Sequence, residues 1–521
     1  MAKLVYLPLI AYNLGETPTK SNPFSRLMSK IGSTMQSLPL VVEIPNPPSP
    51  SQAFQAFKDR PFSFFLDSGM DPQRLGRYSF LGSDPFLIMR SRARDITLIS
   101  PKGEKVVSGN PFDVLYELLQ EYKLNGNPTA LPFLGGAVGY LSYDLGHFIE
   151  KLPSEAVDDL QLPECYLGFY DAVAIFDHLE GRAYIASTGF PEKGGGWQDR
   201  AKSRLEEMKK MAAQTSRLGE GKASYSNQPG GKQVNLHSNF THERYLEAVQ
   251  KARDYIIAGD IFQVNISQRF EADMPLPPYE LYQRLRKINP APFASYLNFD
   301  GVAVVSASPE RFLLLRGNRV ETRPIKGTRP RGKDYNGDEA MARELGNSFK
   351  DKAEHVMIVD LERNDIGRVC RFGTVRVSEL MALEKYATVF HLTSTVEGRL
   401  RPGKNAIDLL KATFPGGSIS GAPKVRAIEI IDELEPTRRS VYTGSIGYLG
   451  FDGGLDLNIV IRTILVKDEK AYFQVGGAVV YDSHPEAEYI ETLDKARALI
   501  QALSMVPQMA AESHRDDFAH R

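Results

Sequence analysis

Short β-strand patterns that follow one another without an intervening helix are the feature that most constrains this chain. Near the C-terminal end, residues 445–451, 455–466 and 471–480 form three apolar runs separated by turn residues at 452–454 and 467–470, the pattern of an antiparallel meander. Further strand patterns, mixed with helical ones at 112–123, 198–211, 241–258, 425–434 and 485–503, occur at 78–81, 86–91, 96–100, 172–176, 302–306, 312–315 and 320–324. Because strands and helices do not alternate regularly, an α+β fold is predicted rather than a doubly wound parallel sheet.

The clearest break in the sequence lies between residues 208 and 240, where Gly, Ser, Asn and Lys dominate and apolar periodicity disappears. Such composition is typical of a linker. We therefore predict an N-terminal domain at 1–215, a flexible linker at 216–236 and a second, catalytic domain at 237–505. Residues 506–521 are predicted to be a disordered tail.

Charge and composition exclude several classes of function. The 521 residues carry a formal net charge of -1, so there is no excess of positive charge of the kind that binds nucleic acid or an anionic membrane. The two cysteines, Cys165 and Cys370, are far apart, so neither a disulfide framework nor a CxxC metal site is expected. No 18-residue apolar stretch and no signal-peptide pattern is found in the sequence, and a cytoplasmic location is expected.

Four carboxylates form two matching pairs on predicted helices. Asp351 and Glu354 are three residues apart, and so are Glu488 and Glu491. This spacing puts each pair on one helical face. Two such faces meeting would make an oxygen-rich cage suited to Mg²⁺. The alternative is two solvated helix faces with ordinary surface ion pairs.

Two glycine-containing segments could each either bind a ligand through the backbone or have a purely structural role. Residues 415–424 lead into the predicted helix at 425–434, where backbone N–H groups could hold a carboxylate, or where the chain makes a tight structural turn. Gly476 and Gly477 lie inside a strand pattern, as a bulge or as a point where a ligand approaches the backbone.

Glu310 and Lys326 lie on either side of a predicted hairpin at Gly317. If the hairpin brings them onto neighbouring strands, a proton donor and a nucleophilic amine share one site. The alternative is a cross-strand salt bridge. His391, isolated in the sequence, is more typical of a core histidine than of a ligand or base.

Together these segments resemble the chorismate-utilising enzymes, the family of anthranilate, aminodeoxychorismate, isochorismate and salicylate synthases. The matching blocks occur in the family's order and extend over nearly the whole chain. They are GRYSF at 76–80, GGAVGY at 135–140, GDIFQVN at 259–265, SPERF at 308–312, RPIKGT at 323–328, EHVMIVDLERND at 354–365, FPGGSISGAPKVRA at 414–427, YTGSIGY at 442–448 and the Glu488/Glu491 helix.

The resemblance implies a fold of antiparallel β-sheets sandwiched by helices, with an N-terminal α+β region. Gln263 resembles the amine-adding branch of the family, because isochorismate and salicylate synthases carry a water-activating lysine there. Lys326 resembles the aminodeoxychorismate synthases, whereas anthranilate synthases typically have alanine at this position. The expected activity is amination of chorismate at C4, serving 4-aminobenzoate and folate synthesis. Formation of anthranilate for tryptophan synthesis and a catalytically silent scaffold are the alternatives.

Roles for single residues also follow from the resemblance. Mg²⁺ is expected at Glu354 and Glu491, with Asp351 and Glu488 close by. Glu310 is expected to protonate the departing hydroxyl, Lys326 to attack the ring, and His391 to lie near the C4 oxygen. The residues expected to bind the substrate are Gln263, Ser418, Tyr442, Arg462, Gly476, Gly477 and Lys495.

Two further ligands are implied. The sequence has no glutaminase nucleophile, so a separate glutamine amidotransferase subunit is expected to supply ammonia. In several relatives the N-terminal domain holds tryptophan, although here Phe65-Leu-Asp-Ser68 replaces the usual Leu-Leu-Glu-Ser. The candidate tryptophan pocket comprises Ser68, Arg77, Tyr78, Ser79, Phe80, Pro292 and Phe293.

Overall fold

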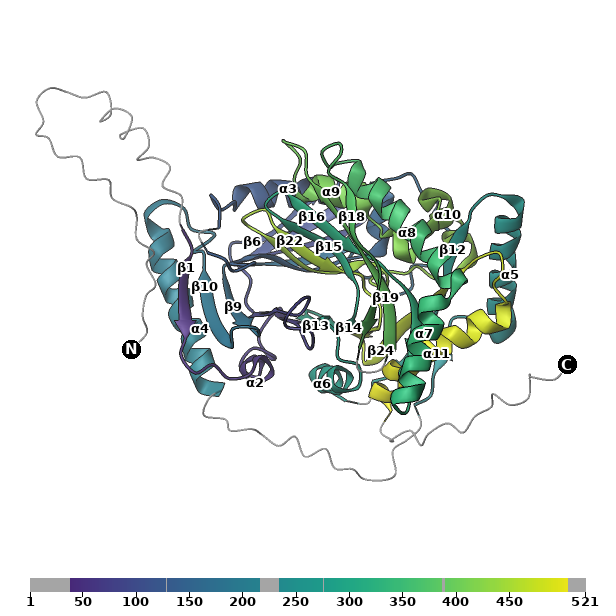
Figure 1. Ribbon diagram of the computed structural model, residues 1–521. Helices are drawn as coiled ribbons and strands as arrows, with labels where there is room; N and C mark the ends of the chain where they lie inside the picture. The colour runs from purple at the N-terminus through teal and green to yellow at the C-terminus, as the bar shows by residue number, and fades with distance from the viewer. Residues whose placement is uncertain (1–37, 128, 216–233, 275, 387–388, 505–521) are drawn as a thin grey trace, which may run out of the picture.

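The computed structural model describes residues 38–127, 129–215, 234–274, 276–386 and 389–504 (Figure 1). In this part of the chain the strands form two sheets of twelve strands each. The pairs at the centre of both sheets are antiparallel. No helix within these ranges is long and apolar enough to cross a membrane.

The first sheet runs in the order β1-β10-β9-β3-β2-β13-β14-β23-β24-β12-β11, with β20 paired to β12. Its strands are β1 (Leu40–Ile44), β2 (Ser63–Asp67), β3 (Tyr78–Gly82), β9 (Ala172–Asp177), β10 (Arg182–Ser187), β11 (His237–Ser238), β12 (Gln263–Asp273), β13 (Phe293–Phe299), β14 (Val302–Ser308), β20 (Gly421–Ala422), β23 (Thr463–Lys467) and β24 (Lys470–Val479).

The second sheet runs in the order β17-β19-β16-β15-β22-β21-β7-β8-β4-β5-β6, with β18 paired to β19. Its strands are β4 (Leu87–Arg92), β5 (Asp95–Ser100), β6 (Gly103–Ser108), β7 (Gly136–Leu141), β8 (Cys165–Tyr170), β15 (Arg311–Arg316), β16 (Arg319–Arg323), β17 (Ile325–Pro330), β18 (Arg376–Lys385), β19 (Val389–Arg399), β21 (Ser445–Gly450) and β22 (Leu455–Asn458).

Helices cover the outer faces of both sheets (Figure 1). They are α2 (Pro50–Phe54), α3 (Pro111–Glu121), α4 (Trp197–Thr215), α5 (His242–Ala258), α6 (Pro278–Ile288), α7 (Tyr335–Asn347), α8 (Phe349–Gly367), α9 (Ala406–Thr413), α10 (Lys424–Leu434) and α11 (Pro485–Leu503), together with the short 3₁₀ turns η1 (Tyr143–Phe148), η2 (Gly194–Gly196) and η3 (Gly417–Ile419).

The three largest apolar clusters among the described residues hold these layers together. One lies between the sheets, where for example Phe80 of β3 meets Tyr448 of β21. A second joins the first sheet to α2, α4, α6 and α11, and a third joins the second sheet to α3, α8 and α9. The central strands of both sheets are therefore covered on both faces, and the predicted α+β fold of antiparallel sheets sandwiched by helices is confirmed.

The N-terminal and C-terminal segments share both sheets. Strand β2 pairs with β13 in the first sheet, and β7 pairs with β21 in the second. The sheets are thus continuous across the predicted domain boundary. Most of the predicted linker, residues 216–233, and the predicted tail at 506–521 lie outside the described residues.

Most local predictions are confirmed, but the prediction of one strand over 455–466 is wrong. This stretch forms β22 in the second sheet and β23 in the first. The chain crosses between the sheets at residues 459–462, where Arg462 adopts a left-handed backbone with φ of 53°. The predicted meander is therefore two antiparallel pairs, β21 with β22 and β23 with β24, and the crossing places Arg462 between the sheets.

Candidate active site

Glu310 is a buried acid between β14 and β15. Its carboxylate accepts a 2.6 Å hydrogen bond from the Ser418 hydroxyl of η3. Burial raises the pKa of Glu310 to about 7, although the Ser418 hydrogen bond, the charge of Lys326 and the backbone of Ile325 oppose the shift. Glu310 can therefore hold a proton near neutral pH, as a general acid must.

Lys326 lies on β17, and burial lowers the pKa of its amine. The negative charges of Glu354, Glu310 and Glu491 oppose this shift, and Lys495 adds to it. These five predicted residues are therefore brought into one electrostatic neighbourhood. Lowering the pKa of a lysine amine increases the neutral, nucleophilic fraction.

The prediction that a hairpin brings Glu310 and Lys326 onto neighbouring strands is wrong. Two strands, β16 and β19, separate β15 from β17 in the second sheet, so Glu310 and Lys326 do not face each other across a hairpin. Among the described residues, no ion pair joins them within 4.0 Å. The cross-strand salt bridge left open by the sequence is thus not formed.

The carboxylates of α11 converge on a glycine of β24. Glu488 is buried, accepts a 2.6 Å hydrogen bond from Ser483, and keeps its second oxygen, Oε2, without a partner. A Cβ added at Gly477 would lie 2.9 Å from Glu488 Oε2 and 3.6 Å from Glu491 Oε1. Glu491 pairs with Lys495 at 2.6 Å, and the charge of Lys495 lowers the pKa of Glu491.

The carboxylates of α8 face this group from the other side. Lys350 lies 3.9 Å from Glu354, and its charge also acts on Glu491 of α11. Burial raises the pKa of Glu354, and Glu491 adds to this effect. Asp351 forms a 3.0 Å ion pair with Arg329. Glu354 of α8 and Glu491 of α11 therefore act on each other electrostatically, while the cage itself stays a prediction.

The donor set suits Mg²⁺. Within the part of the chain that the structure describes, no three His, Cys, Asp or Glu side chains are grouped closely enough to hold an ion alone. Mg²⁺ commonly takes only one or two carboxylates and completes its shell with water and an anionic ligand. The partnerless oxygen of buried Glu488, beside Glu491, fits that requirement.

Cations and a tyrosine surround the same space. Arg462 donates a 2.8 Å hydrogen bond to the Lys495 carbonyl, and Lys495 donates one of 2.7 Å to the Gly476 carbonyl. Burial lowers the pKa of Arg462, while Tyr442 and Glu491 oppose the shift. Two cations near a strand glycine form an environment suited to a carboxylated ligand.

Gln263, at the start of β12, is fully buried, and neither atom of its amide has a hydrogen-bond partner. It pairs in register with Ala422 of β20, beside Gly421. A Cβ at Gly421, where φ is +152°, would lie 2.2 Å from the Gln263 carbonyl oxygen. An unsatisfied buried amide is costly, so a polar ligand is the natural partner for Gln263.

His391 on β19 is buried, and its Nδ1 lies 2.9 Å from the Thr328 hydroxyl. Burial lowers the pKa of His391 to about 3, and the nearby charge of Arg462 adds to the shift. The imidazole is therefore neutral at physiological pH. It lies beside the predicted substrate residues, although its ring is also satisfied in part by Thr328.

Sequence reasoning missed two buried residues of α8. His355 is fully buried, with Nε2 2.6 Å from the Ser394 hydroxyl, and burial lowers the pKa of His355 to about 4. Glu362 accepts a 2.9 Å hydrogen bond from Thr322. Burial raises the pKa of Glu362 well above its usual value, and Glu310 adds to this. Their spacing of seven residues puts them on one face of α8, but apolar and charged residues are mixed around this helix, so the sequence carries no signal of their burial.

A cavity of about 390 Å³ lies between the sheets on the N-terminal side. Six of the seven candidate tryptophan-pocket residues line it, namely Ser68, Arg77, Tyr78, Phe80, Pro292 and Phe293. Ser79 does not line it, because its hydroxyl contacts Asp67 at 3.3 Å and His178 at 2.7 Å on the other face of β3.

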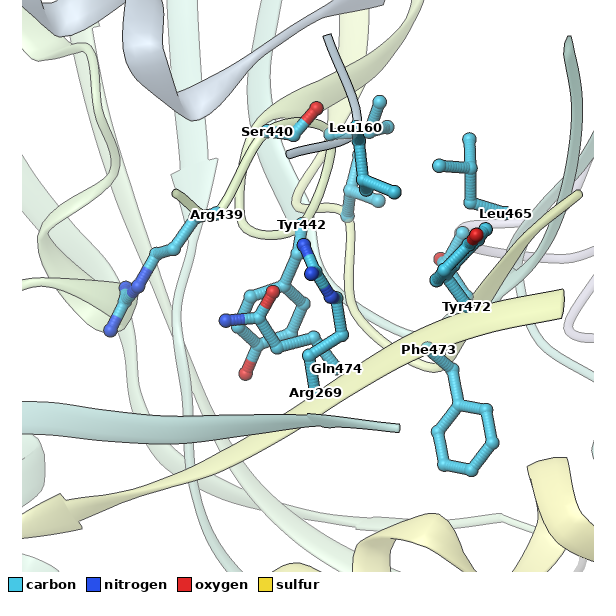
Figure 2. Close-up of a pocket in the computed structure, with 12 residues that line it drawn as sticks. Leu160, Arg269, Arg439, Ser440, Tyr442, Leu465, Tyr472, Phe473 and Gln474 are labelled. Atoms are coloured by element: carbon cyan, nitrogen blue, oxygen red, sulfur yellow. The ribbon is translucent and has the colours of Figure 1, made fainter. Parts of the chain in front are cut away.

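A small cavity of about 30 Å³ lies beside Tyr442 (Figure 2). Arg269 and Gln474 line it, and Arg269 Nη1 and Gln474 Oε1 have no hydrogen-bond partner. A cavity of this size holds about one water molecule. It is therefore too small to bind a ligand larger than a water molecule.

Comparison with known proteins identifies the class to which this fold and site belong. The structure matches that of anthranilate synthase component I from Streptococcus pneumoniae with a TM-score of 0.71 and 33% identity, covering 81% of this chain and 92% of that one. It matches the menaquinone-specific isochorismate synthase from Escherichia coli with a TM-score of 0.65, covering 92% and 98%. At 17% identity, the second likeness shows the fold alone.

Sequence comparison then identifies the family. The family described as chorismate binding enzyme matches residues 63–501. The chain is 41% identical over 442 residues to aminodeoxychorismate synthase component 1 from Bacillus subtilis, covering 84% of this chain and 91% of that protein. It is 44% identical over 449 residues to anthranilate synthase component 1 from Thermus thermophilus, covering 85% and 93%. The chain belongs to the chorismate binding enzyme family and is a chorismate-utilising enzyme.

Proposed function

We propose that this enzyme aminates chorismate at C4 and releases 4-amino-4-deoxychorismate, as an aminodeoxychorismate synthase component 1. The observation that carries the proposal is Lys326, a half-buried lysine whose amine pKa is lowered and which shares the site with Glu310, a buried carboxyl whose pKa is raised. An amine and an acid that are both driven toward their neutral forms suit a nucleophilic substitution with a poor leaving group.

The reaction would proceed in two substitutions. The neutral Lys326 amine attacks C2 of chorismate, the ring double bonds shift, and the C4 hydroxyl leaves as water with a proton from Glu310. Ammonia then attacks C4, the double bonds shift back, and the Lys326 amine leaves C2. The new C4 ammonium gives one proton to ionised Glu310, so enzyme groups and atoms balance.

Chorismate would be held through its two carboxylates. Arg462 and Lys495 supply positive charge, and the amide groups of Gly476, Gly477 and Gln263 supply hydrogen bonds. Tyr442 and Ser418 complete the lining, and neutral His391 orients the C4 hydroxyl. The mutual charge effects of Lys326, Lys495 and Glu491, and of Arg462 with Tyr442 and Glu491, support this arrangement.

Mg²⁺ would be held by Glu354 and Glu491, with Asp351 and Glu488 close by. When bound, it neutralises the ring carboxylate of chorismate and stabilises negative charge developing there. The partnerless Glu488 oxygen and the absence of a Cβ at Gly477 support this assignment.

Ammonia would come from a separate glutamine amidotransferase subunit. Both cysteines are buried, and burial raises the pKa of Cys165 and Cys370, which is the opposite of what a thiolate nucleophile requires. The relatives named as component 1 support a two-component enzyme. The cavity of about 390 Å³ would hold tryptophan.

Anthranilate formation is the second candidate. It is favoured by the 44% identity to the Thermus thermophilus anthranilate synthase component 1. In that reaction ammonia itself attacks C2 and no lysine is needed. The two candidates therefore differ in what they require of Lys326.

The test is the product formed from chorismate, Mg²⁺ and ammonium, read with and without added aminodeoxychorismate lyase. We expect 4-aminobenzoate only with the lyase. Lys326→Ala should abolish it, whereas Lys385→Ala, which removes an exposed lysine paired with Asp338 at 2.9 Å, should not. Fluorescent anthranilate from the unmodified enzyme without lyase would favour the second candidate and reject the first.

A further inference from the structure

The turn that carries Ser418 has little secondary structure of its own. The 3₁₀ turn η3 has three residues, and β20, which follows it, has two. Ser418 nevertheless donates the 2.6 Å hydrogen bond to the carboxylate of Glu310, and the length of this bond depends on where the turn lies. A group that contacts a reacting residue keeps its place only when further contacts hold its backbone.

Asn265 of β12 holds this turn through both its side chain and its backbone. The side-chain amide Nδ2 donates a 3.2 Å hydrogen bond to the Ser418 carbonyl, and the backbone N–H donates one of 2.8 Å to the Ser420 carbonyl. In the sequence Asn265 follows directly on the two residues of β12 that pair with β20. The hydrogen bonding between β12 and this segment therefore continues beyond the end of β20.

Arg439, which is buried, connects the turn to Asn265. Its guanidinium donates a 2.9 Å hydrogen bond to the Ile419 carbonyl and one of 2.8 Å to the Asn265 carbonyl. Glu435 accepts a 2.7 Å hydrogen bond from the same guanidinium and one of 2.9 Å from the Ser267 N–H of β12. The guanidinium is thus fixed by an ion pair that is itself attached to β12.

We propose that Asn265 is a positioning residue for the general acid Glu310 and acts through Ser418. Asn265 and Arg439 together hold three consecutive carbonyls of the turn, those of Ser418, Ile419 and Ser420. The Ser418 hydroxyl is thereby kept within hydrogen-bond distance of the carboxylate, and removing the Asn265 amide releases the Ser418 carbonyl. This inference rests on the proposed function, because it concerns the acid that protonates the leaving hydroxyl.

A double-mutant cycle separates this role from mere packing. Asn265→Ala removes the amide and leaves the backbone contacts of residue 265 in place. It is combined with Ser418→Ala, since a residue that acts through Ser418 loses its effect once the Ser418 hydroxyl is gone. Asn298→Ala is the matched control, because half-buried Asn298 likewise donates a 3.0 Å hydrogen bond from its amide to a backbone carbonyl, that of Lys58.

The readouts are kcat and KM for chorismate, the alkaline limb of the pH profile of kcat at fixed free ammonia, and the midpoint of thermal unfolding. We expect Asn265→Ala to lower kcat by about 10-fold, because a misplaced group in an active site costs up to about 100-fold. KM for chorismate should change less than about threefold. In the Ser418→Ala background, Asn265→Ala should change kcat by less than about twofold.

The alkaline limb reports the Ser418 contact directly. A weaker hydrogen bond from Ser418 stabilises ionised Glu310 less, so Asn265→Ala should move the limb to higher pH, by at most about one unit. Lys326 of β17 and Glu362 of α8, whose charges interact with that of Glu310, are unchanged in every variant. The limb should not move further when Asn265→Ala is added to Ser418→Ala, and it should not move in Asn298→Ala.

A kcat loss in Asn265→Ala that persists in the Ser418→Ala background would overturn the inference, because Asn265 would then not act through Ser418. An unchanged kcat or an unmoved alkaline limb in Asn265→Ala overturns it equally. If Asn265→Ala does not fold, Asn265→Leu, which keeps the branched shape without the amide, decides by the same criteria. The product of the unmodified enzyme tests the proposed function, and the coupling of the two substitutions tests this inference, so the two failures are distinguishable.

Discussion

Replacing Glu310 by Gln should inactivate the enzyme and stabilise it at alkaline pH. Burial raises the pKa of Glu310 from its ordinary 4.5 to about 7, and a pKa unit corresponds to about 1.36 kcal/mol. The difference amounts to about 3 kcal/mol, an upper limit for the cost of ionising the buried carboxyl. The pKa of Glu310 is higher in the folded protein than in the unfolded chain. The favourable contribution of Glu310 to folding stability is therefore fully present below about pH 4.5 and is lost as the pH rises through about 7.

The Gln variant cannot ionise, so its stability advantage over the unmodified enzyme should appear between these pH values. Denaturant unfolding at about pH 5 and pH 8 measures it, since other titrating groups cancel in the comparison. Activity should fall by about 10²- to 10⁴-fold, the range for a lost general acid. Glu104→Gln on exposed β6 controls for removal of a surface carboxylate. An advantage that does not grow with pH would refute the buried-acid reasoning.

Other perturbations give equally direct results. Ser418→Ala removes a 2.6 Å hydrogen bond that stabilises ionised Glu310, a bond worth about 1.5 kcal/mol. The pKa of Glu310 should therefore rise, and the alkaline limb of the pH profile of kcat, measured at fixed free ammonia, should move up by about one pH unit. An unmoved limb would contradict the role of Glu310 as the general acid. Gly477→Ala places a methyl 2.9 Å from Glu488 Oε2 and should weaken Mg²⁺ binding by about tenfold, as calorimetry can check. Glu435→Gln leaves buried Arg439 without its 2.7 Å ion partner and should cost about 3–5 kcal/mol in unfolding free energy; a loss below about 1 kcal/mol would refute this.

Local periodicity predicted most elements because each is short and bounded by turn residues. The helix at 485–503 is found as α11, Pro485–Leu503. The break at 459–462 was not predictable, because Ile459, Val460 and Ile461 are apolar and β-branched and no Gly or Pro marks the break. Sheet order was also beyond sequence patterns, since β2 pairs with β13, more than 200 residues away, through contacts that no local pattern encodes.

The carboxylate pairs were predictable from spacing, but His355 and Glu362 were not. Apolar and charged residues are mixed around α8 instead of separating onto two faces. The helix packs against both β17 and β19, so charged positions become buried that an amphipathic pattern would assign to solvent. Only tertiary packing distinguishes a buried polar residue of this kind from a solvated one.

Glu310 and Lys326 show why the same two residue types can form either a salt bridge or a reactive pair. In water the acid would give its proton to the amine, and the ion pair would contain neither a proton donor nor a nucleophile. Here burial raises the pKa of the acid and lowers the pKa of the amine, while Ser418 rather than Lys326 bonds the carboxyl. The two pKa values move toward each other, which favours the protonated acid and the neutral amine that the proposed substitution needs. Residue identity alone therefore does not distinguish a salt bridge from a reactive pair, whereas the surroundings that shift both pKa values do.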